Sequence, residues 1–245
     1  MEIKNRDLVT LTVEERLESA LRWIAHLEEQ NKKLVRQAER LEEENGLDYL
    51  LGVNNRRGGE RTAERLVKEI FREERRREEE RHELVILFLD IDDFKKINDT
   101  YTEFYGDQVL RQAVAYLKRE ARRRESDIIS RWGGEEFVIF YPRSTAAVVQ
   151  GLFLRSVEEG AQLGFEAVLH IESPKDRKTE KVFVPVTFSG GLTDYNPFVD
   201  FSWRDALQRA NAAMKAAKRA GKNRILKYPA CRIQQFFPDL PEGPA

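Results

Sequence analysis

Leu84–Asp99 has the sequence LVILFLDIDDFKKIND, and this stretch decides the fold of the chain. The continuous apolar run over Leu84–Ile91 has the length of a strand and predicts a buried strand that ends in acidic residues. Its fully apolar part, Leu84–Leu89, is the longest such run in the sequence, yet it is far shorter than the roughly 20 residues that cross a bilayer. We therefore expect no membrane partner and a cytoplasmic protein.

The segments after this strand alternate between helical and strand patterns. Asp107–Arg124 is amphipathic and starts at Asp107, a good N-cap residue, so it predicts a helix. Asp127–Trp132 and Glu135–Tyr141 predict two strands joined by a two-residue hairpin turn at Gly133-Gly134. The later elements are helices over Thr145–Gln162 and Trp203–Ala220 and strands over Glu166–Glu172, Val182–Ser189 and Arg224–Tyr228. This order predicts an α/β (α+β) fold with a mainly antiparallel central sheet flanked by helices, rather than a doubly wound parallel sheet.

The N-terminal part of the chain repeats every seven residues. Thr10, Leu17, Ile24, Asn31, Ala38 and Asn45 occupy position a, and Val13, Ala20, Leu27, Leu34 and Leu41 occupy position d. Every d position is apolar, and Asn31 is the kind of polar a residue that fixes a two-stranded register. The repeat predicts a helix of about 50 Å that dimerises as a coiled coil. The alternative is an amphipathic helix that folds back on the core of its own chain.

These patterns divide the chain into a coiled-coil helix over residues 1–46, a globular domain over 47–229 and a tail over 230–245. Within the globular domain, Glu60–Glu83 alternates acidic and basic residues around few apolar ones, which predicts a helix with a thin buried stripe. The segment Pro229–Ala245 contains half of the eight prolines and predicts disorder.

The composition limits the partners and the metals. The chain has 42 Lys and Arg against 43 Asp and Glu, a formal net charge of -1, and this balance argues against nucleic acid as a partner. Its one cysteine, Cys231, is too few for a thiolate metal site. Its three histidines are scattered and form no ligand pattern. Any metal is therefore expected to be a hard cation bound by carboxylates.

Four acids lie where such a cation could bind. Asp90 and Asp92 follow the buried strand, and Glu135 and Glu136 follow the Gly-Gly turn. If the hairpin lies beside the first strand, these carboxylates meet at one edge of the sheet. Carboxylates brought together without a Lys or Arg between them repel one another unless a divalent cation neutralises them. Mg²⁺ that bridges the phosphates of a nucleotide requires hard oxygen ligands of this kind. The alternative is a strand end and a turn that are acidic without any such role.

Five ordered blocks of the sequence resemble the GGDEF-domain diguanylate cyclases, in the variant with Glu in the third place. The blocks are Asp48-Tyr49-Leu50-Leu51-Gly52-Val53-Asn54-Asn55-Arg56-Arg57, Leu89–Asp99, Arg131-Trp132-Gly133-Gly134-Glu135-Glu136-Phe137, Thr187-Phe188-Ser189-Gly190-Gly191 and Ala217–Asn223. The resemblance covers roughly Leu47 to Tyr228 and implies a palm-like nucleotidyl-cyclase domain. It also implies an enzyme that condenses two GTP into cyclic di-GMP and two pyrophosphates, with Mg²⁺ (or Mn²⁺) as cofactor.

The resemblance assigns roles to individual residues. It implies that Asp90, the carbonyl of Ile91 and Glu135 bind the metal, with Glu136 as a further acid beside it. Either Glu135 or Glu136 could help to deprotonate the attacking 3′-hydroxyl, and the sequence leaves this choice open. Asn98 and Asp107 would bind the guanine base, whose adjacent N–H donors suit an amide and a carboxylate; the alternatives are a turn residue and a plain helix N-cap.

Other residues would bind the phosphates and the product. Gly133 and Gly134 leave room for the backbone to approach a phosphate. Lys95, Lys218 and Lys222 would face the triphosphate as point charges, or they are ordinary solvated lysines. Arg124 and Asp127 occupy the place of the family's R-x-x-D product-inhibition site. The alternative for Arg124 is the basic last turn of a helix.

The sequence departs from the family pattern at Thr102-Glu103, where the family usually has Gly-His. The loss of this glycine leaves two hypotheses open. One is an active cyclase, in which two domains, each with one GTP, meet face to face in a homodimer. The other is a catalytically weak domain that binds GTP or cyclic di-GMP as a signalling module.

Overall fold

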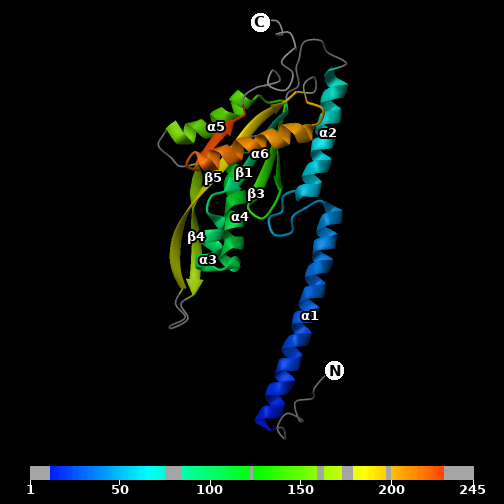
Figure 1. Ribbon diagram of the computed structural model, residues 1–245, viewed down its shortest axis with the longest axis vertical. Coiled ribbons are helices and arrows are strands. Elements are labelled where there is room, and N and C mark those ends of the chain that lie inside the picture. Colours follow the sequence, from blue (N-terminus) through cyan, green and yellow to red (C-terminus); the bar gives the residue numbers. More distant parts are fainter. Residues whose placement is uncertain are drawn as a thin grey trace. The chain divides into compact units, whose positions relative to one another are not determined.

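The computed structural model describes residues 12–74, 84–121, 124–158, 163–172, 179–196 and 200–228. The chain divides into two compact units, Met1–Asn45 and Gly46–Ala245, and each is described by itself. The predicted disordered tail, Cys231, Thr10 and the last part of the predicted helix Glu60–Glu83 lie outside the described residues. Figure 1 labels the elements.

The first unit contains one helix, α1 (Val13–Asn45), of 33 residues. Apolar side chains at the predicted seam are about half exposed or more: Leu17 60%, Ile24 50%, Leu27 49% and Leu34 61%. Within the described part of this unit no other element covers them. Within this unit the apolar stripe is therefore exposed, as the seam of a helix that binds a partner would be. Across the described helices of both units, none is sufficiently long and apolar to cross a membrane.

The second unit is built on a six-stranded sheet with the order β2-β3-β1-β5-β4, in which β6 pairs with β5. The strands are β1 (Leu84–Ile91), β2 (Ile128–Arg131), β3 (Glu136–Pro142), β4 (Gly164–Glu172), β5 (Thr179–Tyr195) and β6 (Arg224–Lys227). Only the β5–β6 pair is parallel. The predicted mainly antiparallel sheet is confirmed. Strand β1 lies at its centre, and all eight residues of β1 are therefore buried.

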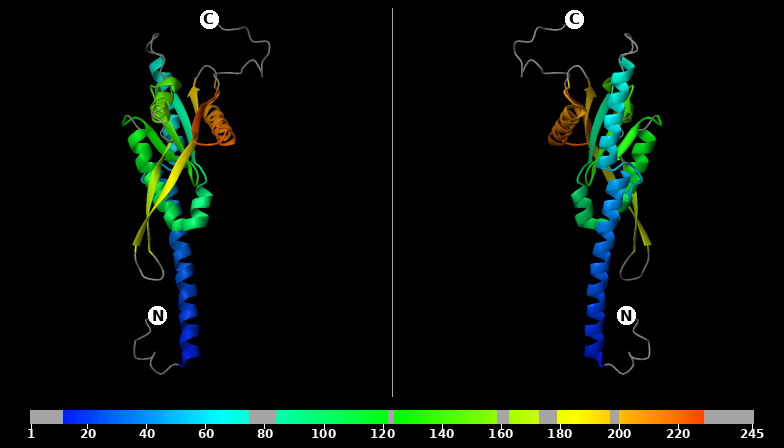
Figure 2. Two further views of the ribbon diagram at one scale, coloured as in Figure 1. Left: turned by 90° about the vertical axis from the view of Figure 1, so that its left-hand side faces the viewer. Right: turned by 90° about the vertical axis from the view of Figure 1, so that its right-hand side faces the viewer.

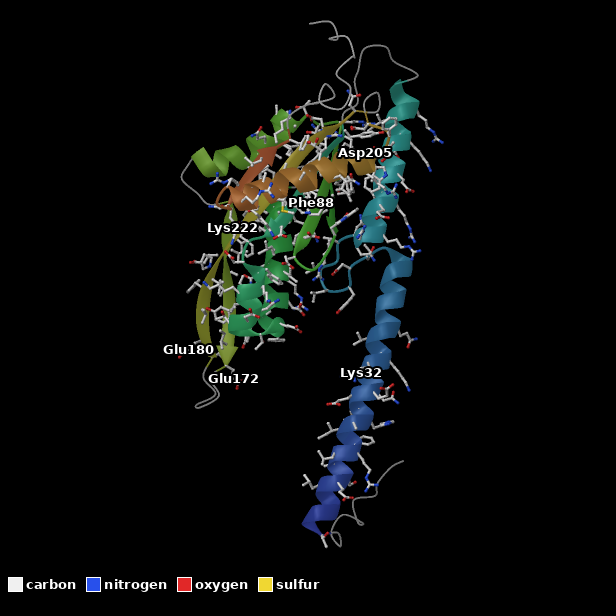
Figure 3. The ribbon with its side chains drawn as sticks, viewed as in Figure 1. Lys32, Phe88, Glu172, Glu180, Asp205 and Lys222 are labelled. Atoms are coloured by element: carbon white, nitrogen blue, oxygen red, sulfur yellow. The ribbon has the colours of Figure 1, made fainter. Side chains whose placement is uncertain are left out.

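Helices cover both faces of this sheet (Figure 2). They are α2 (Arg56–Glu74), α3 (Phe94–Tyr101), α4 (Glu103–Glu120), α5 (Ala146–Glu158) and α6 (Trp203–Arg219). Alternate residues of β1 serve two cores: Leu87 and Leu89 pack on the side of α3, α4 and α5, and Ile86 and Phe88 pack on the side of α2 and α6 (Figure 3). Since Asp90 follows Phe88 by two residues, its side chain points to the α6 side.

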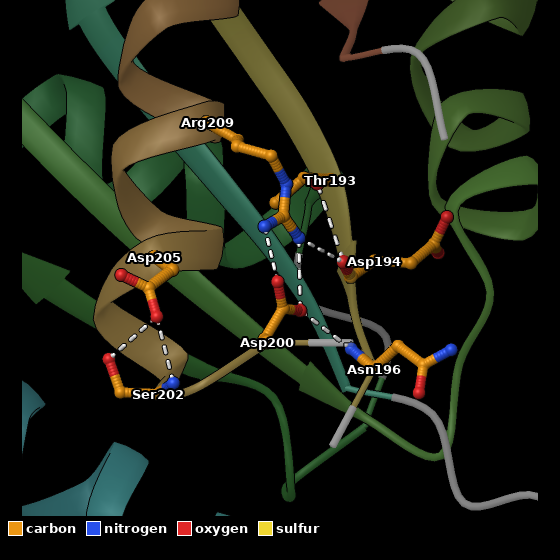
Figure 4. A network of polar contacts seen from close by, with 7 residues as sticks. All are labelled: Thr193, Asp194, Asn196, Asp200, Ser202, Asp205 and Arg209. Carbon is orange, nitrogen blue, oxygen red and sulfur yellow. Dashed lines mark hydrogen bonds and ion pairs between the residues drawn. The ribbon is translucent and has the colours of Figure 1, made fainter. Parts of the chain in front are cut away.

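The N-terminus of α6 is anchored by a network of polar contacts around Asp200 (Figure 4). The guanidinium of Arg209 binds both carboxylate oxygens of Asp200, and it also donates to the carbonyl of Asp194 in β5 at 3.1 Å. Asp205 accepts hydrogen bonds from the backbone N–H and the hydroxyl of Ser202, at 2.9 and 3.2 Å. These contacts fix where α6 starts, and thereby where its last turn reaches the end of β1.

The predicted two-residue turn at Gly133-Gly134 is wrong. Arg131 pairs with Phe137, so the loop between the paired residues is longer, and neither glycine has the positive φ that a type I′ turn requires at both central residues. The reason is a tertiary contact. The carbonyl of Glu135 accepts a hydrogen bond from the N–H of Ile91 at 3.2 Å, which uses this residue to extend the pairing with β1.

Strand β5 continues six residues beyond the predicted end at Ser189. Gly190 and Gly191, which follow the predicted end, both lie inside the strand. A Cβ atom on Gly191 would come within 1.9 Å of the carbonyl oxygen of Ala210. The glycine is therefore needed because α6 packs directly on the backbone of β5.

The predicted start of α4 at Asp107 is also wrong, since the helix begins at Glu103. Asp107 lies in its second turn, so it is not a helix N-cap. The residue that separates α3 from α4 is Thr102, with φ 80° and ψ 161°. This conformation is almost confined to glycine, and a β-branched residue is strained in it.

We expect Thr102→Gly to stabilise the protein. Glycine adopts this conformation without steric cost, and the relief of strain, about 1–3 kcal/mol, exceeds the entropy that glycine loses on folding. The free energy of unfolding, measured by urea denaturation, should rise by about 1 kcal/mol. Thr100→Gly, in the last turn of α3, is the control and should not raise the free energy of unfolding.

Candidate active site

The hairpin loop that contains Glu135 and Glu136 lies against the end of β1. The Cα atom of Asp90 is opposite that of Glu136, and the N–H of Ile91 donates to the carbonyl of Glu135. The fold therefore brings together the backbone positions of all four residues that the sequence assigns to a metal. Because β1 and the loop come from separate parts of the chain, only the register of β1 with β3 creates this meeting point.

Asp90 is buried and paired with a lysine. Its Oδ1 atom lies 2.6 Å from Nζ of Lys218, in the last turn of α6. The pKa of Asp90 is raised from 3.8 to about 6, chiefly because the carboxyl is buried. The hydrogen bond and charge of Lys218 oppose this rise, and the nearby charges of Glu135 and Glu136 add to it. The prediction that no Lys or Arg lies among these acids is wrong for Asp90, because Lys218 is 128 positions away in sequence and comes close only in the fold.

Asp92 does not join the other acids. Its Oδ1 accepts a hydrogen bond from the hydroxyl of Ser189, and its Oδ2 accepts from the hydroxyl of Thr187, both at 2.7 Å. The backbone N–H of Asn223 donates to Oδ2 at 3.0 Å. The prediction that Asp92 stays uncompensated and is available to a metal is therefore wrong: its carboxylate joins β1 to β5 and to the loop before β6.

Arg131 and Asp48 hold the hairpin loop in place. Nη1 of Arg131 lies 2.9 Å from Oδ2 of Asp48, and the guanidinium also donates to the carbonyls of Gly133 and Gly134 at 2.9 to 3.2 Å. The sequence motifs indicate no role for these two residues. One signal could have indicated them: Asp48 and Arg131 have opposite charges and each begins a motif block. Their pairing, however, depends on a contact between segments that are distant in the sequence.

The glycines of the loop differ in what they permit. A Cβ atom on Gly133 would lie 2.7 Å from Oε2 of Glu136. A Cβ atom on Gly134 would have no heavy atom within 4 Å. Gly133 therefore makes room for the Glu136 carboxylate, and Gly134 leaves open space in front of the loop.

Asn98 and Asp107, the residues assigned to guanine, lie on the neighbouring helices α3 and α4. Oδ1 of Asn98 is buried and has no hydrogen-bond partner among the described residues. A Cβ atom on Gly106 would come within 1.9 Å of that oxygen, so the glycine before Asp107 allows the two helices to approach. An unsatisfied buried acceptor beside a half-buried carboxylate suits a ligand with two adjacent N–H donors.

The three lysines assigned to the triphosphate have different surroundings. Lys95 is exposed on the first turn of α3. Lys218 is bound to Asp90, and Nζ of Lys222 lies 2.7 Å from Oδ1 of Asp93, a pairing that raises the pKa of Lys222 and lowers that of Asp93. Lys218 and Lys222 are thus each paired with an aspartate, and the Lys222 pair is partly exposed.

Arg124 and Asp127 form a turn just before β2. The buried carboxylate of Asp127 accepts a hydrogen bond from the backbone N–H of Arg124 at 2.9 Å, and the Arg124 side chain donates to the carbonyl of Arg143 at 3.2 Å. Since α4 ends at Glu120, Arg124 is not part of the last turn of that helix. Its exposed guanidinium side chain lies on a surface turn.

The donors at the end of β1 fit a small hard cation that is bound together with a nucleotide. The described residues contain no group of three or more His, Cys, Asp or Glu side chains placed to bind a metal by themselves. Mg²⁺, however, typically takes one or two carboxylates from the protein and the rest of its ligands from water and phosphate. Asp90, Glu135 and the carbonyl of Ile91 form a set of that kind.

Comparison with known proteins agrees with this geometry. The profile of the family described as "Diguanylate cyclase, GGDEF domain" matches residues 46–224, so the chain belongs to this family. The chain is 32% identical to diguanylate cyclase DgcP of Pseudomonas aeruginosa over 202 residues, which cover 82% of this chain and 25% of DgcP. It spans less than half the length of this and the other curated relatives that it matches.

Two solved structures are similar in fold and sequence. The GGDEF domain of DgcB from Caulobacter crescentus, in complex with c-di-GMP, has a TM-score of 0.59 and 27% identity, and the match covers 76% of this chain and 96% of that one. Diguanylate cyclase SiaD of Pseudomonas aeruginosa, in complex with its activator SiaC, has a TM-score of 0.56 and 27% identity, with 91% and 78% of the two chains covered. The likeness to the GGDEF domain of DgcB confirms the fold class.

The raised pKa of Asp90 makes the stability of the protein depend on pH. The folded protein retains this proton up to about pH 6, whereas the ordinary carboxyl value is 3.8, so the stabilisation is complete below pH 3.8 and is lost as the pH rises through about 6. In metal-free buffer, the free energy of unfolding should therefore fall relative to Asp90→Asn between about pH 4 and 6, by up to about 3 kcal/mol. Urea titrations at several pH values measure the difference, and parallel curves for the two proteins would contradict it.

Proposed function

We propose that the chain is a diguanylate cyclase, which condenses two GTP into cyclic di-GMP and two pyrophosphates. The observation that carries the proposal is the hydrogen bond between Ile91 and Glu135, which brings the Gly-Gly-Glu-Glu loop to the end of β1 beside Asp90. Family membership supports the same reaction. In each half of the reaction a 3′-hydroxyl oxygen attacks the α-phosphorus of the other GTP, the bond to the bridging oxygen breaks, and pyrophosphate leaves.

Asn98 and Asp107 orient the base in this proposal. The free Oδ1 of Asn98 and the carboxylate of Asp107 accept hydrogen bonds from the adjacent N–H groups on the guanine edge. Adenine lacks this pair of donors, so ATP would leave both acceptors unsatisfied. Such a mismatch is costly, and it accounts for selectivity toward guanine.

The residues around Asp90 prepare the site for the triphosphate. Asp90, the carbonyl of Ile91 and Glu135 would bind Mg²⁺, with Glu136 beside them; when bound, the cation neutralises charge on the phosphates. Lys218 would then be released from Asp90 to the phosphates, with Lys95 and Lys222 as further cations. Gly134 leaves space for the backbone to approach a phosphate.

The proton of the attacking 3′-hydroxyl would pass to a carboxylate of the hairpin loop. Both Glu135 and Glu136 are candidates, since both carboxylates are only half-buried and follow directly on the glycines. A glutamate that also binds the cation is a weaker base, which favours Glu136 for this step if Glu135 is the ligand.

The reaction requires two domains, and α1 is the proposed device that brings them together. Its open stripe of Leu17, Ile24, Leu27 and Leu34 fits a second copy of the same helix in a parallel coiled coil. Tethering raises the effective concentration of one GTP-loaded domain near the other. Arg124 and Asp127 are the proposed contact for the product, cyclic di-GMP, and the complex of DgcB with c-di-GMP supports binding of this dinucleotide in the family.

Turnover of GTP tests the proposed reaction. With Mg²⁺ and GTP, the protein should form a product with the mass of cyclic di-GMP, and Glu135→Gln should lower kcat by at least about 100-fold because it removes a charged ligand. Glu172→Gln, an equal change of charge at the far end of β4, is the control and should leave kcat unchanged. Binding of GTP without any product would instead favour the signalling module. The observation behind this alternative is the strained Thr102, which stands where the family usually has glycine.

Dimerisation through α1 has its own test. Ile24→Glu places two charges in the seam, so the dissociation constant of the dimer should rise by at least about 100-fold. Lys32→Glu, on the outer face of the same helix, should change it little (Figure 3). Sedimentation velocity measures both, and a dimer that survives Ile24→Glu would contradict the coiled coil.

A further inference from the structure

The last turn of α6 and the loop before β6 are joined to the end of β1 and the turn after it by three aspartates. Asp90 binds Lys218 at 2.6 Å, Asp92 accepts the N–H of Asn223 at 3.0 Å, and Asp93 binds Lys222 at 2.7 Å. Asp90 is assigned to the metal and Asp92 joins the strands. The carboxylate of Asp93 has no role so far, although it holds a lysine that we assign to the triphosphate.

The start of α3 does not depend on the Asp93 carboxylate. Asp93 occupies the N-cap position, where an aspartate side chain commonly accepts a hydrogen bond from the first helical turn, but it makes no such bond here. The N–H groups of Lys96 and Ile97 are bound instead by the backbone carbonyl of Asp93, at 2.9 and 3.3 Å. Among the contacts of the described residues, the Asp93 carboxylate therefore forms its ion pair with Lys222.

Lys222 is presented by a fixed backbone. Gly221, Lys222 and Asn223 follow one another with φ values of 107°, 62° and 48°. The side chain of Asn223 accepts the N–H of Leu163 at 2.9 Å, and its own N–H binds Asp92. The Lys222 side chain can thus change partners without movement of the loop, and Asp93 is its ion-pair partner within the described part of the chain.

The Asp93–Lys222 pair is weak enough to be exchanged. Its side chains are 60% and 41% exposed, and exposed ion pairs contribute little to stability because solvent screens them. A triphosphate brings several negative charges to the same ammonium group, so it displaces the Asp93 carboxylate from Lys222. The loss of the Asp93–Lys222 ion pair lowers the net affinity for the triphosphate. The remaining carboxylate also repels the phosphates, which acts in the same direction.

We propose that Asp93 is an internal competitor of the nucleotide: its carboxylate holds Lys222 until the triphosphate of GTP replaces it. Asp93 is thus a residue that sets the affinity for GTP without touching the base or the metal. The inference rests on the proposed function, because that function assigns Lys222 to the triphosphate.

Binding of 3′-deoxy-GTP with Mg²⁺ tests the competition, because this analogue lacks the attacking hydroxyl and cannot condense. Calorimetry should show that Asp93→Asn lowers its Kd by about 2- to 5-fold, the size expected for loss of an exposed ion pair and one repulsive charge. Inorganic tripolyphosphate should respond in the same way, since the effect acts on the phosphates and not on the base. The gain should shrink at high salt.

Two matched variants separate competition from a general change of charge. Asp99→Asn removes an equal charge from an exposed position of the same helix and should leave Kd within about 1.5-fold of the wild type, since its field is screened over that distance. In a Lys222→Gln background, Asp93→Asn should lose most of its effect. An unchanged Kd in Asp93→Asn, or full tightening without Lys222, would overturn the proposal.

The two proposals fail in distinguishable ways. If the wild type binds 3′-deoxy-GTP but forms no cyclic dinucleotide from GTP, the cyclase reaction is refuted, and the role of Asp93 is still decided by the Kd values. If neither the wild type nor Asp93→Asn binds the analogue or tripolyphosphate, the assignment of Lys222 to phosphate falls, and the competition falls with it.

Discussion

The buried carboxylate of Asp92 is the contact on which the arrangement of this domain depends. It accepts hydrogen bonds from two hydroxyls of β5, on Thr187 and Ser189, and from the backbone of Asn223 before β6. Bonds to a charged acceptor are stronger than those between neutral groups, and a buried carboxylate without them would carry a large desolvation cost. The contact therefore holds the end of β1, the middle of β5 and the loop after α6 in one fixed relation.

This relation explains the electrostatics of the candidate site. With the loop after α6 held against the end of β1, Lys218 faces Asp90 and Lys222 faces Asp93, so each of these lysines has a carboxylate partner. The charge of Lys218 partly compensates the buried carboxylate of Asp90. In the proposed function, a cation takes the place of Lys218 at Asp90, and the released lysine binds the phosphates.

The sequence predicted the fold class and the order of elements in the second unit, because both rest on local patterns. The apolar run of β1 and the amphipathic stripe of α6 are visible in a window of a few residues. It failed where a local pattern has two physical uses. Gly133-Gly134 suggested a two-residue turn, but the loop that contains these glycines pairs with β1. The strand predicted to end at Ser189 continues through Gly191, which packs directly under α6. Thr102 carries no helix signal, so the start of α4 was placed four residues late.

By itself the sequence determined which residues could take part in the chemistry, since acids, amides and lysines at motif spacing define a narrow set of ligands. Only the tertiary structure decided how that set divides. In the fold, Lys218 forms an ion pair with Asp90, and the carboxylate of Asp92 is hydrogen-bonded to the neighbouring strand β5. It also showed that Arg131 and Asp48 hold the loop of Glu135. The physical reason is that the charge state and partner of a carboxylate depend on what lies within a few ångströms of it, and these neighbours come from segments that the register of β1 brings together.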